Sequence, residues 1–189
     1  SGSQTGTYNT AIGYNALNVN TTGANSVAVG AGALQSNTTG DQQTAIGRGA
    51  LSSTTTGGYN SAGGWASLYS NTSGAYNTSW GHSALYSNTT ASNNTVVGYQ
   101  AGYSNTTGSN INAFGRAALY TNTTGIENVA IGNSSMYYNT TGGYNTAVGT
   151  NSLANNTTAS NNTAVGYQAG YTNSTGTRNT FVGRGTGYT

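Results

Sequence analysis

Residues 9–23 read NTAIGYNALNVNTTG, and this pattern repeats along the whole chain. Counted from Asn9, each unit has 17 residues and the consensus N-T-A-[IV]-G-x-x-A-L-x-x-N-T-T-G-x-x, without insertion or deletion. Residues at one position of successive units form a column, numbered from Asn9 as column 1. We therefore expect a single repeat array over residues 1–189: a partial unit at 1–8, ten full units at 9–178 and a partial unit at 179–189. Column 5 marks the period at Gly13, Gly30, Gly47, Gly64, Gly81, Gly98, Gly115, Gly132, Gly149, Gly166 and Gly183.

The constant spacing predicts stacked coils, because each coil must present its apolar positions in register with its neighbours. A disordered Asn/Thr/Gly-rich chain would tolerate changes in length. The units are too short for two helices and are rich in β-branched residues, Gly and Tyr. We expect an all-β fold, a parallel β-solenoid (β-roll) of about eleven 17-residue coils. Each coil would carry two short strands, 10–12 and 15–19 in the first, and a turn at 20–23. An antiparallel hairpin array is disfavoured, because its strongest signal, Asn-Gly, never occurs.

Two columns are expected to face each other across the coil as a continuous apolar core. Column 4 is Ile12, Val29, Ile46, Gly63, Trp80, Val97, Phe114, Ile131, Val148, Val165 and Val182. Column 9 is Leu17, Leu34, Leu51, Leu68, Leu85, Gly102, Leu119, Met136, Leu153, Gly170 and Gly187. Gly63 would leave room for the oversized Trp80. Where Gly replaces Leu in column 9, the Tyr that follows could swing into the vacancy.

Column 12 is almost entirely asparagine, and stacked amides can form hydrogen bonds from coil to coil. The Thr pair and Gly that follow fit a turn. We therefore expect a structural Asn ladder, with Thr54 as the exception. Its members are Asn20, Asn37, Asn71, Asn88, Asn105, Asn122, Asn139, Asn156 and Asn173.

Alanines fill columns 3 and 8, next to the two expected core columns. Successive residues of a strand point to opposite faces, so we expect these Ala stripes to lie outside. A straight row of Ala suits close approach of another backbone, which favours side-by-side assembly of identical chains. The alternative is that Ala only keeps a thin coil thin.

The composition argues against several functions. Four Arg, no Lys and a net charge of +2 do not suit a nucleic-acid partner. No apolar run is long enough for insertion in a membrane, and the lack of Cys excludes disulfides and Cys-based metal sites. Asp41 and Glu127 fall five coils apart, about 24 Å, which is too far for a carboxylate pair. His82 has no acidic or Cys neighbour in the repeat. We therefore expect no catalytic residue, no metal, no cofactor and no enzyme.

Tyrosines form the candidate surface for a ligand or partner. Tyr offers a large rigid face and one hydroxyl, which suits glycan or protein recognition. The alternative is a ladder of stacked rings that stabilises the solenoid. Column 10 holds Tyr69, Tyr86, Tyr103, Tyr120, Tyr137, Tyr171 and Tyr188, and column 17 holds Tyr59, Tyr76 and Tyr144. Ice binding through Thr21, Thr38, Thr55 and Thr72 is a minor hypothesis, because these residues lie at a turn.

The S/T-x-A-[IV]-G and x-x-A-L motifs resemble the coiled repeats of trimeric autotransporter adhesin heads. The fuller N-T-A-[IV]-G-x-x-A-L-x-x-N-T-T-G unit is similar to repeats of bacterial and phage tail-fibre proteins that precede an intramolecular chaperone domain. The resemblance covers essentially the whole chain and implies a homotrimer in an extracellular, cell-surface or virion location. We expect a structural fibre or filament segment, or alternatively an adhesion module that binds cell-surface glycans through the Tyr columns.

Overall fold

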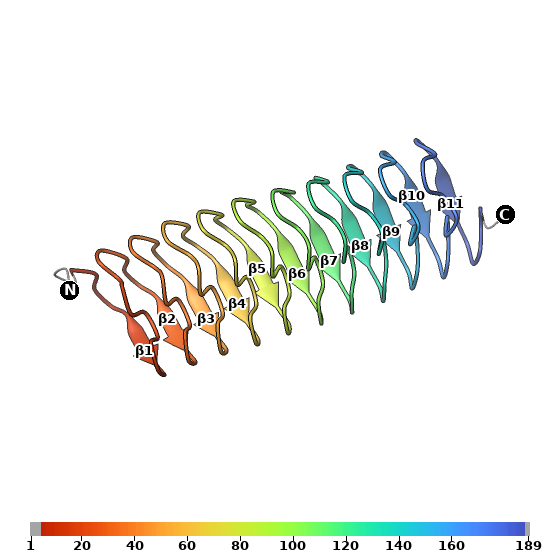
Figure 1. The fold of residues 1–189 in the computed structure, drawn as a ribbon. Helices are drawn as coiled ribbons and strands as arrows, with labels where there is room; N and C mark the ends of the chain where they lie inside the picture. The colour runs from red at the N-terminus through yellow and green to blue at the C-terminus, as the bar shows by residue number, and fades with distance from the viewer. Residues whose placement is uncertain (1–4, 188–189) are drawn as a thin grey trace.

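The computed structural model describes residues 5–187 as one stack of coils that runs from the N- to the C-terminal end (Figure 1). Eleven parallel strands form a single sheet in sequence order, and each residue pairs with the residue 17 positions later. Within this range there is no helix, and hence none that could cross a membrane. The predicted parallel β-solenoid is confirmed. The strands are β1 (Thr10–Ile12), β2 (Val27–Val29), β3 (Thr44–Ile46), β4 (Ser61–Gly63), β5 (Thr78–Trp80), β6 (Thr95–Val97), β7 (Asn112–Phe114), β8 (Val129–Ile131), β9 (Thr146–Val148), β10 (Thr163–Val165) and β11 (Thr180–Val182).

Each coil has one strand, so the predicted second strand at 15–19 is wrong. That segment is a turn in which Asn15 and Leu17 have φ of 54° and 52°. A third left-handed residue, Asn25 at φ 56°, comes after the Asn-Thr-Thr-Gly turn. Extended backbone needs negative φ at every residue, so these positions cannot belong to a strand. The three left-handed residues bend the chain round and return it to the next strand without proline.

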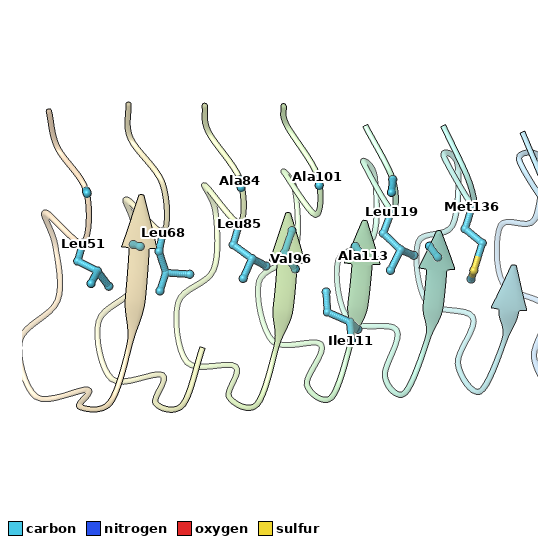
Figure 2. Packing of buried hydrophobic residues seen from close by; sticks show 14 of the residues in the cluster. Leu51, Leu68, Ala84, Leu85, Val96, Ala101, Ile111, Ala113, Leu119 and Met136 are labelled. Carbon is cyan, nitrogen blue, oxygen red and sulfur yellow. The ribbon is translucent and has the colours of Figure 1, made fainter. Parts of the chain in front are cut away.

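The core is formed by the Ala residues of columns 3 and 8 and the Leu residues of column 9 (Figure 2). This corrects the expectation that columns 4 and 9 form it. The Ile/Val column, predicted to be inside, is exposed: Ile46 is 42% and Ile131 is 41% accessible. Ala45 and Ala130, predicted to be outside, are completely buried. The fully buried members are Ala28, Ala45, Ala62, Ala113, Ala130, Ala147 and Ala164 in column 3; Ala33, Ala50, Ala84, Ala101, Ala118 and Ala169 in column 8; and Leu34, Leu51, Leu68, Leu85, Leu119, Met136 and Leu153 in column 9.

The physical reason for this arrangement is the left-handed backbone. Alternation holds in the strand, so column 3 faces inward and column 4 outward. It fails at columns 8 and 9, because Leu34 has φ of 50° and the segment is not extended. Ala33 and Leu34 therefore both face the interior. The inward Ala of each strand leaves just enough depth for one Leu layer.

Large side chains of the strands lie beside the vacancies in the Leu column. A Cβ at Gly102 would lie 3.2 Å from Leu85 Cδ2 and 3.6 Å from Val96 Cγ1, where Val96 replaces the usual Ala. Phe181 of column 3 in the same way occupies the space beside Gly170 and Gly187. Tyr103 stays in a stack with other Tyr rings, so the predicted swing is wrong at this position. Tyr188 lies outside the described residues.

The predicted complementarity of Gly63 and Trp80 is confirmed, but on the outer face of the sheet. A Cβ at Gly63 would collide with the indole of Trp80, which lies over it. The glycines of column 5 are required for another reason. Gly98 has φ of 143°, and a Cβ there would collide with the carbonyl of Gly115 in the next coil. Only glycine permits both the dihedral angle and the close approach, which explains the regular recurrence of this residue.

Candidate functional site

The predicted asparagine ladder of column 12 is present in the interior. Each Nδ2 donates to the carbonyl three residues later at 2.9–3.1 Å, as Asn105 does to Gly108. The second N–H donates to Oδ1 of the Asn in the preceding coil at 2.7–3.2 Å, as in Asn105 to Asn88. These amides are buried, apart from the half-buried Asn173. Their hydrogen bonds hold the coils together, so the ladder is structural and offers no ligand site.

The one interruption of this ladder is compensated within its own coil. Thr54 has no amide to donate to Asn37, and its hydroxyl only accepts from Asn71 at 3.4 Å. Gln43, eleven residues earlier in the same coil, donates its Nε2 to Asn37 Oδ1 at 2.9 Å instead. The longer Gln side chain in column 1 thus replaces the missing bond in column 12.

A second ladder, in column 1, was not predicted from the sequence. Nδ2 of each Asn donates to the carbonyl 14 residues later at 2.7–2.9 Å, as in Asn77 to Ala91. Oδ1 accepts the backbone N–H of the column 1 residue in the next coil at 2.9–3.0 Å, as in Asn77 from Asn94. The regular Asn that opens the consensus unit was the available signal.

Asn94 is the exception in this second ladder. It accepts the N–H of Ile111 at 3.0 Å, but its own buried Nδ2 has no hydrogen-bond partner. Among the described residues it is the one buried side-chain polar atom in that state. Such an atom destabilises the fold, because it has lost water without gaining another acceptor.

The threonines proposed for ice binding use their hydroxyls within the stack. Thr21 Oγ1 donates to the carbonyl of Thr38 at 2.8 Å, and Thr38 Oγ1 donates to Thr55 at 3.0 Å. Thr55 and Thr72 continue the series. These hydroxyl hydrogens point along the stack, so we do not carry the ice-binding hypothesis further.

The tyrosines of column 10 form a ladder of parallel rings. Centroids are 5.0–5.3 Å apart and planes are inclined by only 4–11°. The geometry matches the structural alternative: ring faces within the ladder lie against each other and only the edges meet solvent. The two end rings, Tyr69 and Tyr137, have a ladder neighbour on one side only, because Ser52 and Ala154 occupy the column next to them. Tyr171 follows beyond the gap at Ala154. The stacked members are Tyr69, Tyr86, Tyr103, Tyr120 and Tyr137.

Two further columns also carry stacked aromatic groups. In column 6, the exposed His82 lies between Trp65 and Tyr99, with centroids 4.6 and 5.3 Å apart. In column 17, Tyr59 stacks on Tyr76 at 4.9 Å. His82 is therefore a surface residue that stacks between two larger rings.

A cleft of about 250 Å³ lies between columns 6 and 10, at the N-terminal end of the Tyr ladder. It forms where the ladder ends, because Ser52 leaves the space of a ring empty beside Tyr69. Gly49 lines the cleft, and a Cβ added there would come 3.3 Å from the Tyr69 ring. The cleft is lined by Ala31, Gly32, Gln35, Arg48, Gly49, Ser52, Trp65, Ala66, Tyr69 and Tyr86.

A second cleft of about 200 Å³ occurs at the other gap in the ladder, beside Ala154. It is lined by Tyr137, Tyr138 and Tyr171 together with Ser134 and Asn151, and so has aromatic walls but no charged residue. Both clefts arise in one way: a small residue interrupts a column of rings.

The acidic residues are isolated from these clefts. Asp41 Oδ1 accepts the backbone N–H of Ala24 at 2.7 Å, and Glu127 lies five coils further along the stack. Among residues 5–187 there is no group of three or more His, Asp or Glu side chains that could hold a metal ion.

No protein-family model matches this chain, and searches of curated proteins and of solved structures gave no match. The function therefore has to be inferred from the surfaces of the solenoid itself.

Proposed function

We propose that this chain is a stiff shaft segment of an extracellular or virion fibre, in which identical chains pack side by side. The single observation that carries this proposal is the row of outward apolar side chains, mainly Ile and Val, that follows the sheet from β1 to β11, with Trp80 lying over Gly63. A shaft needs length, resistance to bending and a surface for its sister chains, and each has a counterpart in the solenoid.

Length and stiffness come from the coil-to-coil bonds. Ten steps between eleven strands at about 4.8 Å give a rod of about 48 Å. Every coil is joined to the next by parallel strand pairing and by the backbone bonds of its turns, and most coils also by the two Asn ladders. Bending the rod would stretch several of these hydrogen bonds at once.

The surface for a sister chain is the outer face of the sheet. Column 4 leaves Ile46, Val97 and Phe114 about 40% accessible, although each is strongly apolar. A stripe about 48 Å long and about 7 Å wide, the distance between alternate residues of a strand, covers more than 300 Å². The largest apolar patch on a soluble monomer is typically about 300–600 Å² and often functional, which supports this stripe as an interaction surface. The chain also has few charges to repel a copy of itself.

This proposal keeps the expectation of side-by-side assembly but moves it to a different stripe. The Ala columns first expected to contact a partner are buried in the core, whereas the Ile/Val column takes their place outside. The resemblance to trimeric adhesin heads makes three the expected copy number.

The test is the mass of the purified chain in solution by light scattering. A homotrimer would have three times the 19.0 kDa mass of the chain. The double variant Val97→Asp, Ile131→Asp should revert to the monomer, because it places two charges in the apolar stripe. The control Thr107→Asp, Thr141→Asp adds the same charge on exposed turns and should leave the mass unchanged. A wild-type monomer at all concentrations, or equal masses for both double variants, would refute assembly through this face.

A second candidate function is glycan recognition. The stacked rings present mainly their edges, so the ladder as a whole is a poor platform for a sugar. The observation that favours this function is local: at the gap beside Tyr69, aromatic and polar groups surround a cleft.

A further inference from the structure

We propose that the cleft between Trp65 and Tyr69 binds one ring of an acidic sugar, with Arg48 as the group that recognises its carboxylate. The inference rests on the second candidate function, glycan recognition, and is independent of the shaft. It assigns the binding to one place and one ligand class, in place of a general Tyr surface.

The aromatic part of the cleft consists of two rings held by the stack behind them. Tyr69 lies against Tyr86 at 5.2 Å, and its other side is turned to the gap at Ser52. Trp65 stacks on His82 at 4.6 Å, and its other face is turned to the preceding coil, which carries Arg48 in the same column. Both rings are about 40% accessible. Because each is fixed from behind, little side-chain freedom is lost when a ligand binds.

The polar part of the cleft comes from the two preceding coils. The lining includes Arg48, Ser52 and Gln35, whose guanidinium, hydroxyl and amide groups are donors and acceptors. Gln35 Oε1 lies 3.2 Å from the place of a Cβ on Gly32, which also lines the cleft. None of the described residues that line the cleft is acidic. The site therefore carries one positive charge and favours an anion.

These features fit a pyranose ring better than a flat aromatic ligand. A pyranose has an apolar C–H face that can lie on Tyr69 or Trp65, and hydroxyls around it that need partners such as Ser52 and Gln35. A nucleobase presents two apolar faces, whereas the position beside Tyr69 in its own column is the polar Ser52 and not a second ring. The volume, about 250 Å³, lies below the roughly 300–1,000 Å³ of sites for drug-sized ligands, so it suits a single ring. A carboxylate on that ring would meet Arg48 in a charge-assisted, bidentate hydrogen bond.

The second cleft, beside Ala154, serves as an internal comparison. It has the same origin and aromatic walls, but polar Ser134 and Asn151 in place of a cation. It should therefore show no preference for an acidic sugar.

The experiment uses the full chain with Trp80→Phe, so that Trp65 is the single tryptophan and reports on the cleft by fluorescence. The probes are N-acetylneuraminic acid, glucuronic acid, galactose and uridine monophosphate. At least one acid should bind at millimolar concentration and at least about tenfold more tightly than galactose, as expected for a charged hydrogen bond. Arg48→Gln should remove this preference, and Tyr69→Ala should weaken the binding of every sugar.

The matched control is Arg116→Gln, since Arg116 occupies the same column four coils later and lies outside the cleft. It should bind the acids as the unmodified chain does, and both variants should keep the melting temperature. No binding of either acid, equal binding of galactose, tighter binding of the nucleotide, or equal losses in Arg48→Gln and Arg116→Gln would overturn the assignment. A trimer that binds no sugar would refute this site and leave the shaft standing, whereas a monomer that binds acids would do the reverse.

Discussion

Replacing Asn77 by alanine should destabilise the protein much more than the same change at Asn94, although the two residues occupy one column in neighbouring coils. Asn77 donates to Asn60 Oδ1 and to the Ala91 carbonyl, and it accepts the backbone N–H of Asn94. Its loss removes three hydrogen bonds and leaves that buried N–H without an acceptor. At about 1 kcal/mol for each bond, plus about 1–3 kcal/mol for the abandoned donor, we expect a loss of about 4–6 kcal/mol.

At Asn94 the stabilising and destabilising effects of replacement by alanine nearly cancel. The side chain accepts one hydrogen bond, from Ile111, and its Nδ2 is buried without a partner. Alanine loses this bond and leaves the buried N–H of Ile111 without an acceptor, but it also removes the unpartnered Nδ2, so the two desolvation costs offset and the free energy of unfolding should fall by about 1 kcal/mol. Urea denaturation followed by circular dichroism measures both variants against the parent chain. Equal losses at the two positions would contradict the ladder geometry, because both side chains have the same size and burial.

Two further predictions concern single positions. Gly98→Ala should lower the free energy of unfolding by about 3 kcal/mol or more in denaturation experiments, because φ is 143° and the Cβ would meet the Gly115 carbonyl. Gly185→Ala should lower it by only about 1 kcal/mol, because φ is 64° and nothing lies within 4 Å of the added Cβ. Similar losses for the two variants would exclude the proposed contact between coils. Leu85→Ala should lower the free energy of unfolding by about 2–5 kcal/mol, and Val97→Ala in the monomer by less than about 1.5 kcal/mol, because Leu85 is completely buried and Val97 lies on the outer face. The reverse order would place the core on the other side of the strand.

The sequence was sufficient to predict the architecture, because the period alone requires neighbouring coils to repeat the same contacts. The first strand, Thr10–Ile12, has the predicted bounds. The Asn ladder could also be predicted, since identical amides one coil apart satisfy each other in only one simple way. Both predictions depend only on which residue type repeats in a column, and not on the path of the chain within a coil.

The orientation of the apolar columns could not be predicted in this way. Alternation of inward and outward side chains holds only in extended backbone, and within residues 15–19 the left-handed Asn15 and Leu17 break it. Leu is not a residue that indicates a positive φ, so the left-handed backbone at column 9 could not be predicted from the residue type. The Gly residues that replace Leu in column 9, at Gly102 and Gly170, are consistent with a left-handed position, but Gly in a core column equally fits a simple gap in packing.

The cleft could not be predicted for a related reason. It depends on residues from four coils, including the absence of a ring at Ser52 and of a Cβ at Gly49. Each is an ordinary substitution in its own coil. Only the spatial relation of columns 6 and 10, which the left-handed turn sets, brings Trp65 and Tyr69 to the two sides of one cleft.

The most direct test of the stacked coils is the distance between spin labels placed on one column. The chain has no cysteine, so Cys pairs can be introduced at the exposed turn residues Thr56 and Thr124, four coils apart, and Thr22 and Thr158, eight coils apart. Double electron–electron resonance on the monomeric Val97→Asp, Ile131→Asp background should give narrow distributions near about 19 Å and about 38 Å, so that the distance doubles with the number of coils. Broad distributions near about 45 Å and about 65 Å, which grow only with the square root of the separation, would indicate a flexible chain and contradict the solenoid.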